Sequence, residues 1–205
     1  EPMQSKEIIH THEKTPPYLL FYGSGFIKEK LPPKTRVIYP KPPIQGVANP
    51  RESIRDALLS PQGQKPLPEL LTQGMRLTIA FDDISLPLPQ TTTPDFRQIA
   101  IEEILKITKQ KNITDIHLIG AICLHRKMTP QELKRIVGKK IFKQFYPQRL
   151  YNFDAEDSEN IVQLGKSEQH GPVYFSKRAA ESDLVIYVDR KSTRLNSSHL
   201  VISYA

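Results

Sequence analysis

The pattern of apolar and polar residues changes near residue 75. From there to Val188, short apolar runs rich in β-branched residues alternate with longer stretches whose apolar residues recur at helical spacing. Such alternation is typical of a mostly parallel sheet whose faces are covered by helices. The pattern therefore predicts an α/β, Rossmann-like domain over residues 75–188, with a mostly parallel sheet flanked by helices.

Three strands and two main helices are expected in this domain. The strands are predicted at residues 77–81, 115–120 and 184–188, and a helix with one apolar face at 95–111. The second helix begins after Thr129, because Pro130 and Glu132 supply the first-turn proline and the acid of a capping box. Gly138 is expected to end this helix before a short helix at 139–145. Weaker patterns predict a loop at 152–160, a strand at 173–175 and a helical turn at 178–182.

Residues 1–74 form a proline-rich N-terminal arm in this interpretation. Paired prolines favour extended segments joined by fixed turns, with short strands at 18–22 and 36–39. A turn is expected at Gly23-Ser24-Gly25. Asn49 and Pro50 are a favourable N-cap and first residue for one helix that ends near Ser60.

The last seventeen residues, 189–205, do not resemble natural protein. The block at 189–199 and the final Ile-Ser-Tyr-Ala resemble one reading frame of a sequencing-library adapter, with a short variable gap between them. The alternative is a basic, serine-rich tail that binds acidic partners. We expect residues 189–205 to be a non-native tail that takes no part in the core.

Composition excludes few classes of protein. The chain is 38% hydrophobic and 25% charged, which is ordinary for a soluble domain, and contains no apolar run long enough to span a membrane. The net charge of +7 is spread among acids or along helix faces, as at Lys106, Lys109 and Lys111, so no nucleic-acid partner is expected. The single cysteine, Cys123, fits a cytoplasmic protein, and we expect a packed thiol.

Polar residues follow two of the predicted parallel strands. Asp82 and Asp83 come directly after the first, and His125, Arg126 and Lys127 follow the second just before a helix N-terminus. Ligands of open α/β sheets bind at the carboxyl ends of strands, and helix N-termini favour anions. These two loops are therefore the candidate site. Taken alone, the acids could be ordinary turn residues and His125 a loop or cap histidine, whereas His117 alternates with apolar residues and is interpreted as structural.

Together, the two loops resemble the nickel-pincer lactate racemase family and its hydroxyacid-racemase relatives. Further similarity lies in residues 150–157 and 178–188, so that the resemblance covers about residues 75–188. It implies a fragment of a racemase or epimerase of small 2-hydroxy acids that uses a nickel-pincer nucleotide. Catalysis in this family passes a hydride from the substrate to the cofactor, while histidines move the hydroxyl proton.

The same resemblance assigns site residues. It places His125 at a catalytic histidine and Asp83, Ile84, Ser85 and Leu86 in the loop that contacts the cofactor. Leu86 stands where lactate racemases carry an arginine, so the substrate can differ from lactate. The cofactor-tethering lysine, the second catalytic histidine and the nickel-binding histidine of the family would follow Val188, so no metal ligand is assigned and the fragment is expected to be inactive.

A second function remains open at this point. The two loops could belong to a non-catalytic α/β module that binds a nucleotide or an anionic metabolite. A lysine and histidines in the following part of the gene would favour the enzyme, and their absence would favour the binding module. The residues carry no signal for an oligomeric state.

Overall fold

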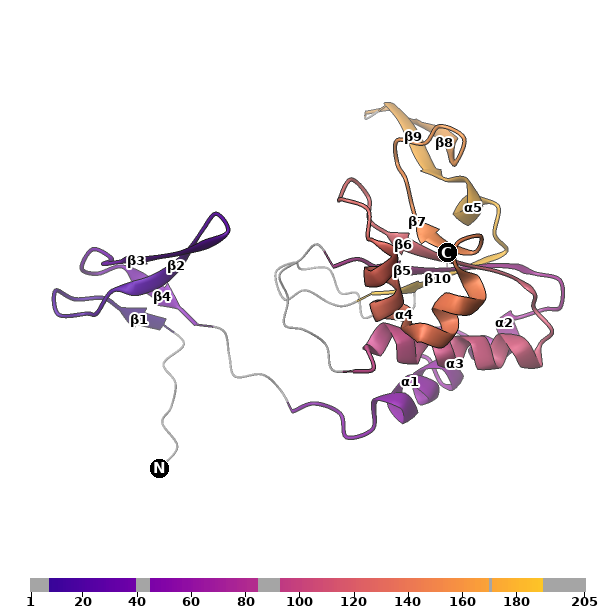
Figure 1. Ribbon diagram of the computed structural model, residues 1–205, viewed down its shortest axis with the longest axis horizontal. Helices are drawn as coiled ribbons and strands as arrows, with labels where there is room; N and C mark the ends of the chain where they lie inside the picture. The colour runs from indigo at the N-terminus through magenta and orange to yellow at the C-terminus, as the bar shows by residue number, and fades with distance from the viewer. Residues whose placement is uncertain (1–7, 40–44, 85–92, 170, 190–205) are drawn as a thin grey trace. The chain divides into compact units, whose positions relative to one another are not determined.

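The computed structural model describes residues 8–39, 45–84, 93–169 and 171–189, and the chain divides into two compact units, Glu1–Gly46 and Val47–Ala205 (Figure 1). Each unit is considered by itself. Ser85 and Leu86 of the predicted cofactor loop lie outside the described residues. The predicted non-native tail also lies outside them, except for Asp189.

The first unit consists of two antiparallel strand pairs. β1 (Ile8–His10) pairs with β4 (Arg36–Ile38), and β2 (Tyr18–Tyr22) pairs with β3 (Gly25–Glu29) in a hairpin. Gly23 has a φ of 58° in the hairpin turn, a conformation that glycine adopts without strain. The sequence predicted β2, β4 and the turn. It missed β1 and β3, whose residues are exposed and show no apolar–polar alternation that marks a buried face.

A four-stranded parallel sheet forms the centre of the second unit. Its strand order is β10-β5-β6-β7, with β5 at Arg76–Asp82, β6 at Asp115–Ala121, β7 at Leu150–Asn152 and β10 at Leu184–Val188. All three pairings are parallel. The α/β fold with a parallel sheet and flanking helices is thus confirmed, and so is the parallel arrangement of the three predicted strands. The three-residue strand β7 was missed because it is too short for a periodic pattern.

Two long helices cover one face of this sheet (Figure 1). α3 (Phe96–Gln110) begins at Asp95, whose carboxylate accepts from the Arg97 N–H. α4 (Pro130–Phe145) begins at the predicted capping box of Thr129 and Glu132. It is kinked at Gly138, where φ is 82° and ψ is 159°, so the predicted break is present. Within the described residues, no helix combines the length and apolar character needed to cross a membrane.

Two helices before residue 75 belong to the second unit. α1 (Pro50–Leu59) and α2 (Leu67–Leu70) contribute Leu58 and Leu67 to the same buried core as the sheet, each with no exposed surface. Arg51 of α1 also donates to Glu102 and Glu103 of α3, both at 2.6 Å. The sequence grouped these helices with the arm because a proline-rich loop follows them. Both helices instead contact α3, and the division lies at Gly46.

A hairpin leads from β7 back to the edge of the sheet. β8 (Ile161–Ser167) and β9 (Gly171–Ser176) pair antiparallel, and α5 (Lys177–Ala180) connects them to β10. The predicted strand and helical turn correspond to β9 and α5, whereas β8 was missed because most of its residues are exposed. Arg178 of α5 holds this return against the sheet through Asp115, at 2.8 Å, and through the Leu77 carbonyl.

Candidate functional site

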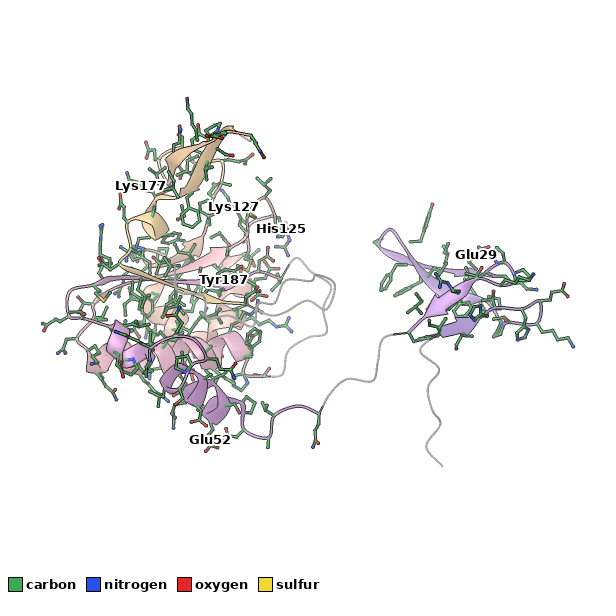
Figure 2. The ribbon with its side chains drawn as sticks, turned by 180° about the vertical axis from the view of Figure 1, so that it is seen from behind. Glu29, Glu52, His125, Lys127, Lys177 and Tyr187 are labelled. Carbon is green, nitrogen blue, oxygen red and sulfur yellow. The ribbon has the colours of Figure 1, made fainter. Side chains whose placement is uncertain are left out.

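The two candidate loops meet at one edge of the sheet. β5 ends at Asp82 and β6 at Ala121, and the parallel register places these two residues opposite each other. The segments that follow therefore leave the sheet side by side at its carboxyl edge, where open α/β sheets bind ligands. Figure 2 shows His125 and Lys127 close together on this part of the second unit.

Asp83 and His125 form a hydrogen-bonded pair. The Asp83 Oδ2 atom lies 2.7 Å from His125 Nδ1, and the side chain of Asp83 is 10% exposed while that of His125 is 52% exposed. An ionised carboxylate can only accept, so the neutral imidazole carries its proton on Nδ1. The Nε2 atom is then an acceptor on a ring that solvent can reach. An accessible base held by a covered carboxylate is an arrangement suited to proton transfer.

Ion pairs on both sides of His125 hold its loop. Arg126 donates to both carboxylate oxygens of Glu132, at 2.9 and 2.7 Å. The hydrogen bond from Arg126, together with those from Thr129, lowers the pKa of Glu132 to about 2. Lys127 pairs with Asp154, which follows β7. The two cations that the sequence suggested for anion binding are thus paired with acids of the same unit.

Asn152 fixes the far end of the same loop. Its Oδ1 atom accepts from the Met128 N–H at 3.1 Å, and its Nδ2 atom donates to the Met128 carbonyl at 2.8 Å. One side-chain amide therefore satisfies both polar groups of one loop residue. Sequence reasoning did not assign this role to Asn152, although the residue lies in the 150–157 segment that carried the resemblance. A lone asparagine at a strand end gives no signal of its partner.

The loop of Asp83 rests on a buried arginine. Arg97, only 3% exposed, bonds to the carboxylates of Asp95 and Asp82 and to backbone oxygens of the loop. Burial opposes the charge of Arg97, but the hydrogen bonds that it donates to Asp95 and the charge of Asp82 outweigh burial and raise the pKa of Arg97. Asp82 is therefore part of a buried ion cluster, not an ordinary turn acid. The sequence did not reveal Arg97, because a cation in a first helical turn is usually solvated.

Three further residues that the sequence analysis considered can be placed in the structure. Ile84 is 37% exposed directly after Asp83, at the same edge of the sheet. Cys123 was expected to be a packed thiol, but it is exposed. It lies in the turn after β6 with a φ of 53°. The structural interpretation of His117 agrees with its hydrogen bond to the Tyr151 hydroxyl, at 3.0 Å, and burial with the nearby Arg178 lowers the pKa of His117.

Tyr187 adds a phenol near the same edge that the sequence did not single out. Tyr187 lies opposite Ala80 in the register of β10 and β5. Ala80 precedes Asp82 by two residues, so the two residues face the same side of the sheet. Burial, followed by the charges of Asp189, Asp82 and Asp83, raises the pKa of Tyr187 to about 12. The hydroxyl therefore stays protonated at physiological pH.

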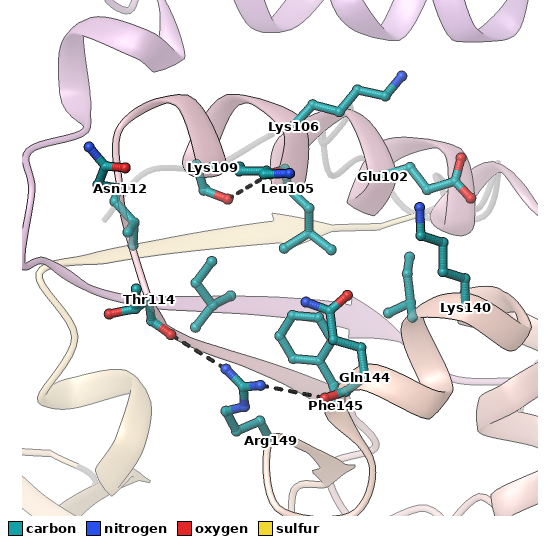
Figure 3. A pocket seen from close by; sticks show the side chains of 14 residues that line it. Glu102, Leu105, Lys106, Lys109, Asn112, Thr114, Lys140, Gln144, Phe145 and Arg149 are labelled. Atoms are coloured by element: carbon teal, nitrogen blue, oxygen red, sulfur yellow. Dashed lines mark hydrogen bonds between the residues drawn. The ribbon is translucent and has the colours of Figure 1, made fainter.

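Pockets lie at both edges of the sheet. One of about 370 Å³ borders the His125 loop and is lined by Lys127, Tyr151, Asp154 and Arg178 among others. A larger one, of about 740 Å³, lies between α3 and α4 at the amino edge, where Arg149 donates to the carbonyls of Thr114 and Gln144 (Figure 3). The larger pocket is therefore distant from the Asp83–His125 pair. Within the described part of the chain, no group of three His, Cys, Asp or Glu residues could hold a metal ion.

The region that contains these two loops matches a known protein family. Residues 22–190 match the family described as the lactate racemase N-terminal domain. The chain belongs to this family. The match includes the whole Asp83–His125 region, so the predicted relationship to lactate racemases is confirmed. At the level of the lactate racemase family, the chain is related to isomerases.

The individual relatives in this family share low sequence identity with the chain. A lactate racemase from Thermoanaerobacterium thermosaccharolyticum is 27% identical over 133 residues, which are 65% of this chain and 29% of that protein. The solved structure of the lactate racemase apoprotein from the same organism superposes with a TM-score of 0.57 at 24% identity, over 83% of this chain and 38% of the other. The chain thus spans about a third of the length of these lactate racemases.

Proposed function

We propose that this chain is the front part of a racemase or epimerase of small 2-hydroxy acids, with His125 as its proton-transfer residue. The observation that supports the proposal most directly is the hydrogen bond between His125 Nδ1 and Asp83 Oδ2, at 2.7 Å, at the carboxyl edge of the sheet. Family membership supplies the reaction class. The pair supplies the chemistry that moving a hydroxyl proton requires.

The role of each side chain follows from the geometry of the pair. With its proton on Nδ1, His125 accepts the hydroxyl proton of the substrate at Nε2, as C2 loses a hydride and becomes a carbonyl carbon. Asp83 then stabilises the imidazolium that forms, since its carboxylate is held against Nδ1. In the return step, Nε2 gives the proton back to the oxygen when the hydride returns to C2. No net proton or electron is consumed.

We propose a nickel-pincer nucleotide as the cofactor that binds at this edge. Its planar ring requires an accessible surface beside the proton-transfer residue, and the exposed Ile84 next to Asp83 provides one. When bound, this cofactor supplies a hydride acceptor that can return the hydride to either face of the substrate carbon. We assign Asp83 and Ile84, with the adjoining Ser85 and Leu86, to cofactor contact. We assign no nickel ligand to the described residues, which contain no group of three His, Cys, Asp or Glu residues that could hold a metal ion.

The binding-module alternative has less support from the site. The cations that would attract an anionic metabolite, Arg126 and Lys127, are paired with Glu132 and Asp154. A module that only binds would not need an imidazole aligned by a covered carboxylate. Binding of a nucleotide without turnover of any 2-hydroxy acid would favour this alternative.

The test is turnover of the complete enzyme, with this domain joined to the remainder of a lactate-racemase-family protein and supplied with cofactor. His125→Ala should lower the racemisation rate of one or both enantiomers by roughly two to four orders of magnitude, the range for loss of a general acid or base. Circular dichroism during urea unfolding should show little change in stability, because an exposed loop side chain packs little.

His117→Gln is the matched control, since His117 lies in β6 of the same domain and its side chain contacts Tyr151 and Asp115. This variant should retain turnover within about threefold. Unchanged turnover of His125→Ala in both directions would require His125 to be removed from the mechanism.

A further inference from the structure

A guanidinium group lies beneath the loop of Asp83 with every nitrogen atom bonded. The Nε and Nη2 atoms of Arg97 donate to the two carboxylate oxygens of Asp95, at 3.0 and 2.9 Å. The Nη1 atom donates to the carbonyls of Asp82 and Asp83, at 2.7 and 3.0 Å, and lies 3.2 Å from the Asp82 carboxylate. The side chain is 4% exposed, so water cannot replace these bonds.

One side of this group is anchored in the core. Asp95 is the N-cap of α3 and also accepts from the Arg97 N–H at 2.9 Å. The next turns of α3 bury Ile101 and Ile104 completely against the sheet. The guanidinium is therefore attached to the N-terminus of a helix that packs in the core, through a planar, two-bond contact with one carboxylate.

The other side determines the backbone at Asp83. The Asp82 carbonyl belongs to the peptide group before the Asp83 Cα atom, and the Asp83 carbonyl belongs to the peptide group after it. Arg97 binds both. Fixing the two peptide planes that flank one Cα atom fixes φ and ψ of that residue. The direction of the Asp83 side chain, which ends 2.7 Å from His125 Nδ1, is thereby set.

We propose that Arg97 is a positioning residue that aims the Asp83 carboxylate at His125. It reaches neither His125 nor the accessible edge of the site itself, and its effect passes through the Asp83 backbone. Lysine cannot replace it, because an ammonium group lacks the planar fork that serves Asp95 and two carbonyls together. The consequence for catalysis rests on the function proposed above, whereas the positioning itself does not.

The test uses the 205-residue chain without substrate or cofactor. Long-range ¹H–¹⁵N NMR correlations report which ring nitrogen of a neutral histidine carries the proton, and His125→Gln identifies the His125 signals. In the wild type, His125 should show the Nδ1–H pattern. In Arg97→Lys, the signals should shift toward the Nε2–H pattern, as they should in Asp83→Asn. The double variant should show no further shift, because both changes remove the same contact.

Arg51→Lys is the matched control. Arg51 also bridges carboxylates of α3, through Glu102 and Glu103, but it is remote from the loop of Asp83. This variant should lower stability in urea while leaving the His125 pattern unchanged. If both variants lose stability but only Arg97→Lys shifts the His125 signals, the shift reports positioning and not general destabilisation.

A folded Arg97→Lys protein with the wild-type His125 pattern would overturn the proposal. If Arg97→Lys does not fold, Asp82→Asn provides the second variant, since it weakens one of the contacts of Arg97 while keeping the arginine. It should shift the His125 pattern in the same direction, and an unchanged pattern contradicts positioning. In the complete enzyme, Arg97→Lys should lower kcat by about 10- to 100-fold with KM almost unchanged, because it displaces a catalytic group. Because the NMR result involves no reaction, it stands whether or not racemisation is found.

Discussion

At the scale of single residues, Asp83 differs from a turn carboxylate in how completely it is covered. Its side chain is 10% exposed and its backbone is held by Arg97, while His125 is half exposed. A covered acid and an accessible base can hold one tautomer and still reach a substrate. The sequence placed both residues in the two loops of one candidate site, but it did not predict the hydrogen bond between them. Arg97 and Asn152 could not be predicted, because each acts through a backbone group that lies far away in the sequence.

The tautomer held by Asp83 gives the prediction at this scale. Asp83→Asn keeps the shape of the side chain but can donate to Nδ1, which places the imidazole proton on Nε2 and removes the base. Turnover in the complete enzyme should fall by roughly two to four orders of magnitude. Asp56→Asn, on an exposed position of α1, should not change it. Equal turnover of wild type and Asp83→Asn would mean that the pair is not used.

At the scale of elements, α3 connects the site to the helices before it. Its N-terminus carries Asp95 and Arg97, and its middle carries Glu103, which is bonded to Arg51, Arg55 and Lys106. Burial opposes ionisation of Glu103, but these hydrogen bonds outweigh it and lower its pKa to about 2. The apolar stripe of α3 was predictable, whereas the role of Asp95 as its N-cap was not predicted. The charge contacts with α1 were not, because they depend on tertiary packing.

The lowered pKa of Glu103 predicts a pH dependence. A carboxylate whose pKa is lowered by folding stabilises the folded protein fully above its unfolded pKa, here near 4.5. That contribution is lost as the pH falls toward about 2. Because its partners are half exposed, Glu103→Gln should cost about 1–2 kcal/mol of unfolding free energy at pH 7. The difference from wild type in urea unfolding should shrink below pH 4.5. Glu69→Gln, at an exposed site, is the control and should show no such trend. A stability difference between wild type and Glu103→Gln that grows in acid would contradict the lowered pKa of Glu103.

At the scale of the whole molecule, the alternation of strands and helices was enough to predict the parallel sheet. The strands that were missed, β1, β3, β7 and β8, are short or exposed, so no buried face imposed a pattern on their sequence. The limit of the sheet-containing unit also differed from the sequence boundary. A proline-rich loop signalled a boundary, but the buried Leu58 and Leu67 attach α1 and α2 to the core.

The placement of α1 in the second unit can be tested by unfolding. Leu58→Ala should lower the unfolding free energy of that unit by about 2–5 kcal/mol, because a completely buried leucine leaves a cavity. Leu19→Ala changes the same side chain in β2 of the first unit, where Leu19 is 67% exposed, and should cost less than about 0.5 kcal/mol. Hydrogen exchange of α3 amides during the same experiment should increase only in Leu58→Ala. A small effect of Leu58→Ala would place α1 outside the core.

The central claim is that this domain serves a hydride-transfer racemase in which His125 moves only the hydroxyl proton. The most direct measurement follows the C2 hydrogen of a 2-hydroxy acid labelled there with deuterium, in the complete enzyme with cofactor and in ordinary water. The account predicts that the inverted product retains its deuterium, and that His125→Ala slows its formation by roughly two to four orders of magnitude. Inverted product that has lost its label to solvent, or no inversion of any 2-hydroxy acid, would contradict it.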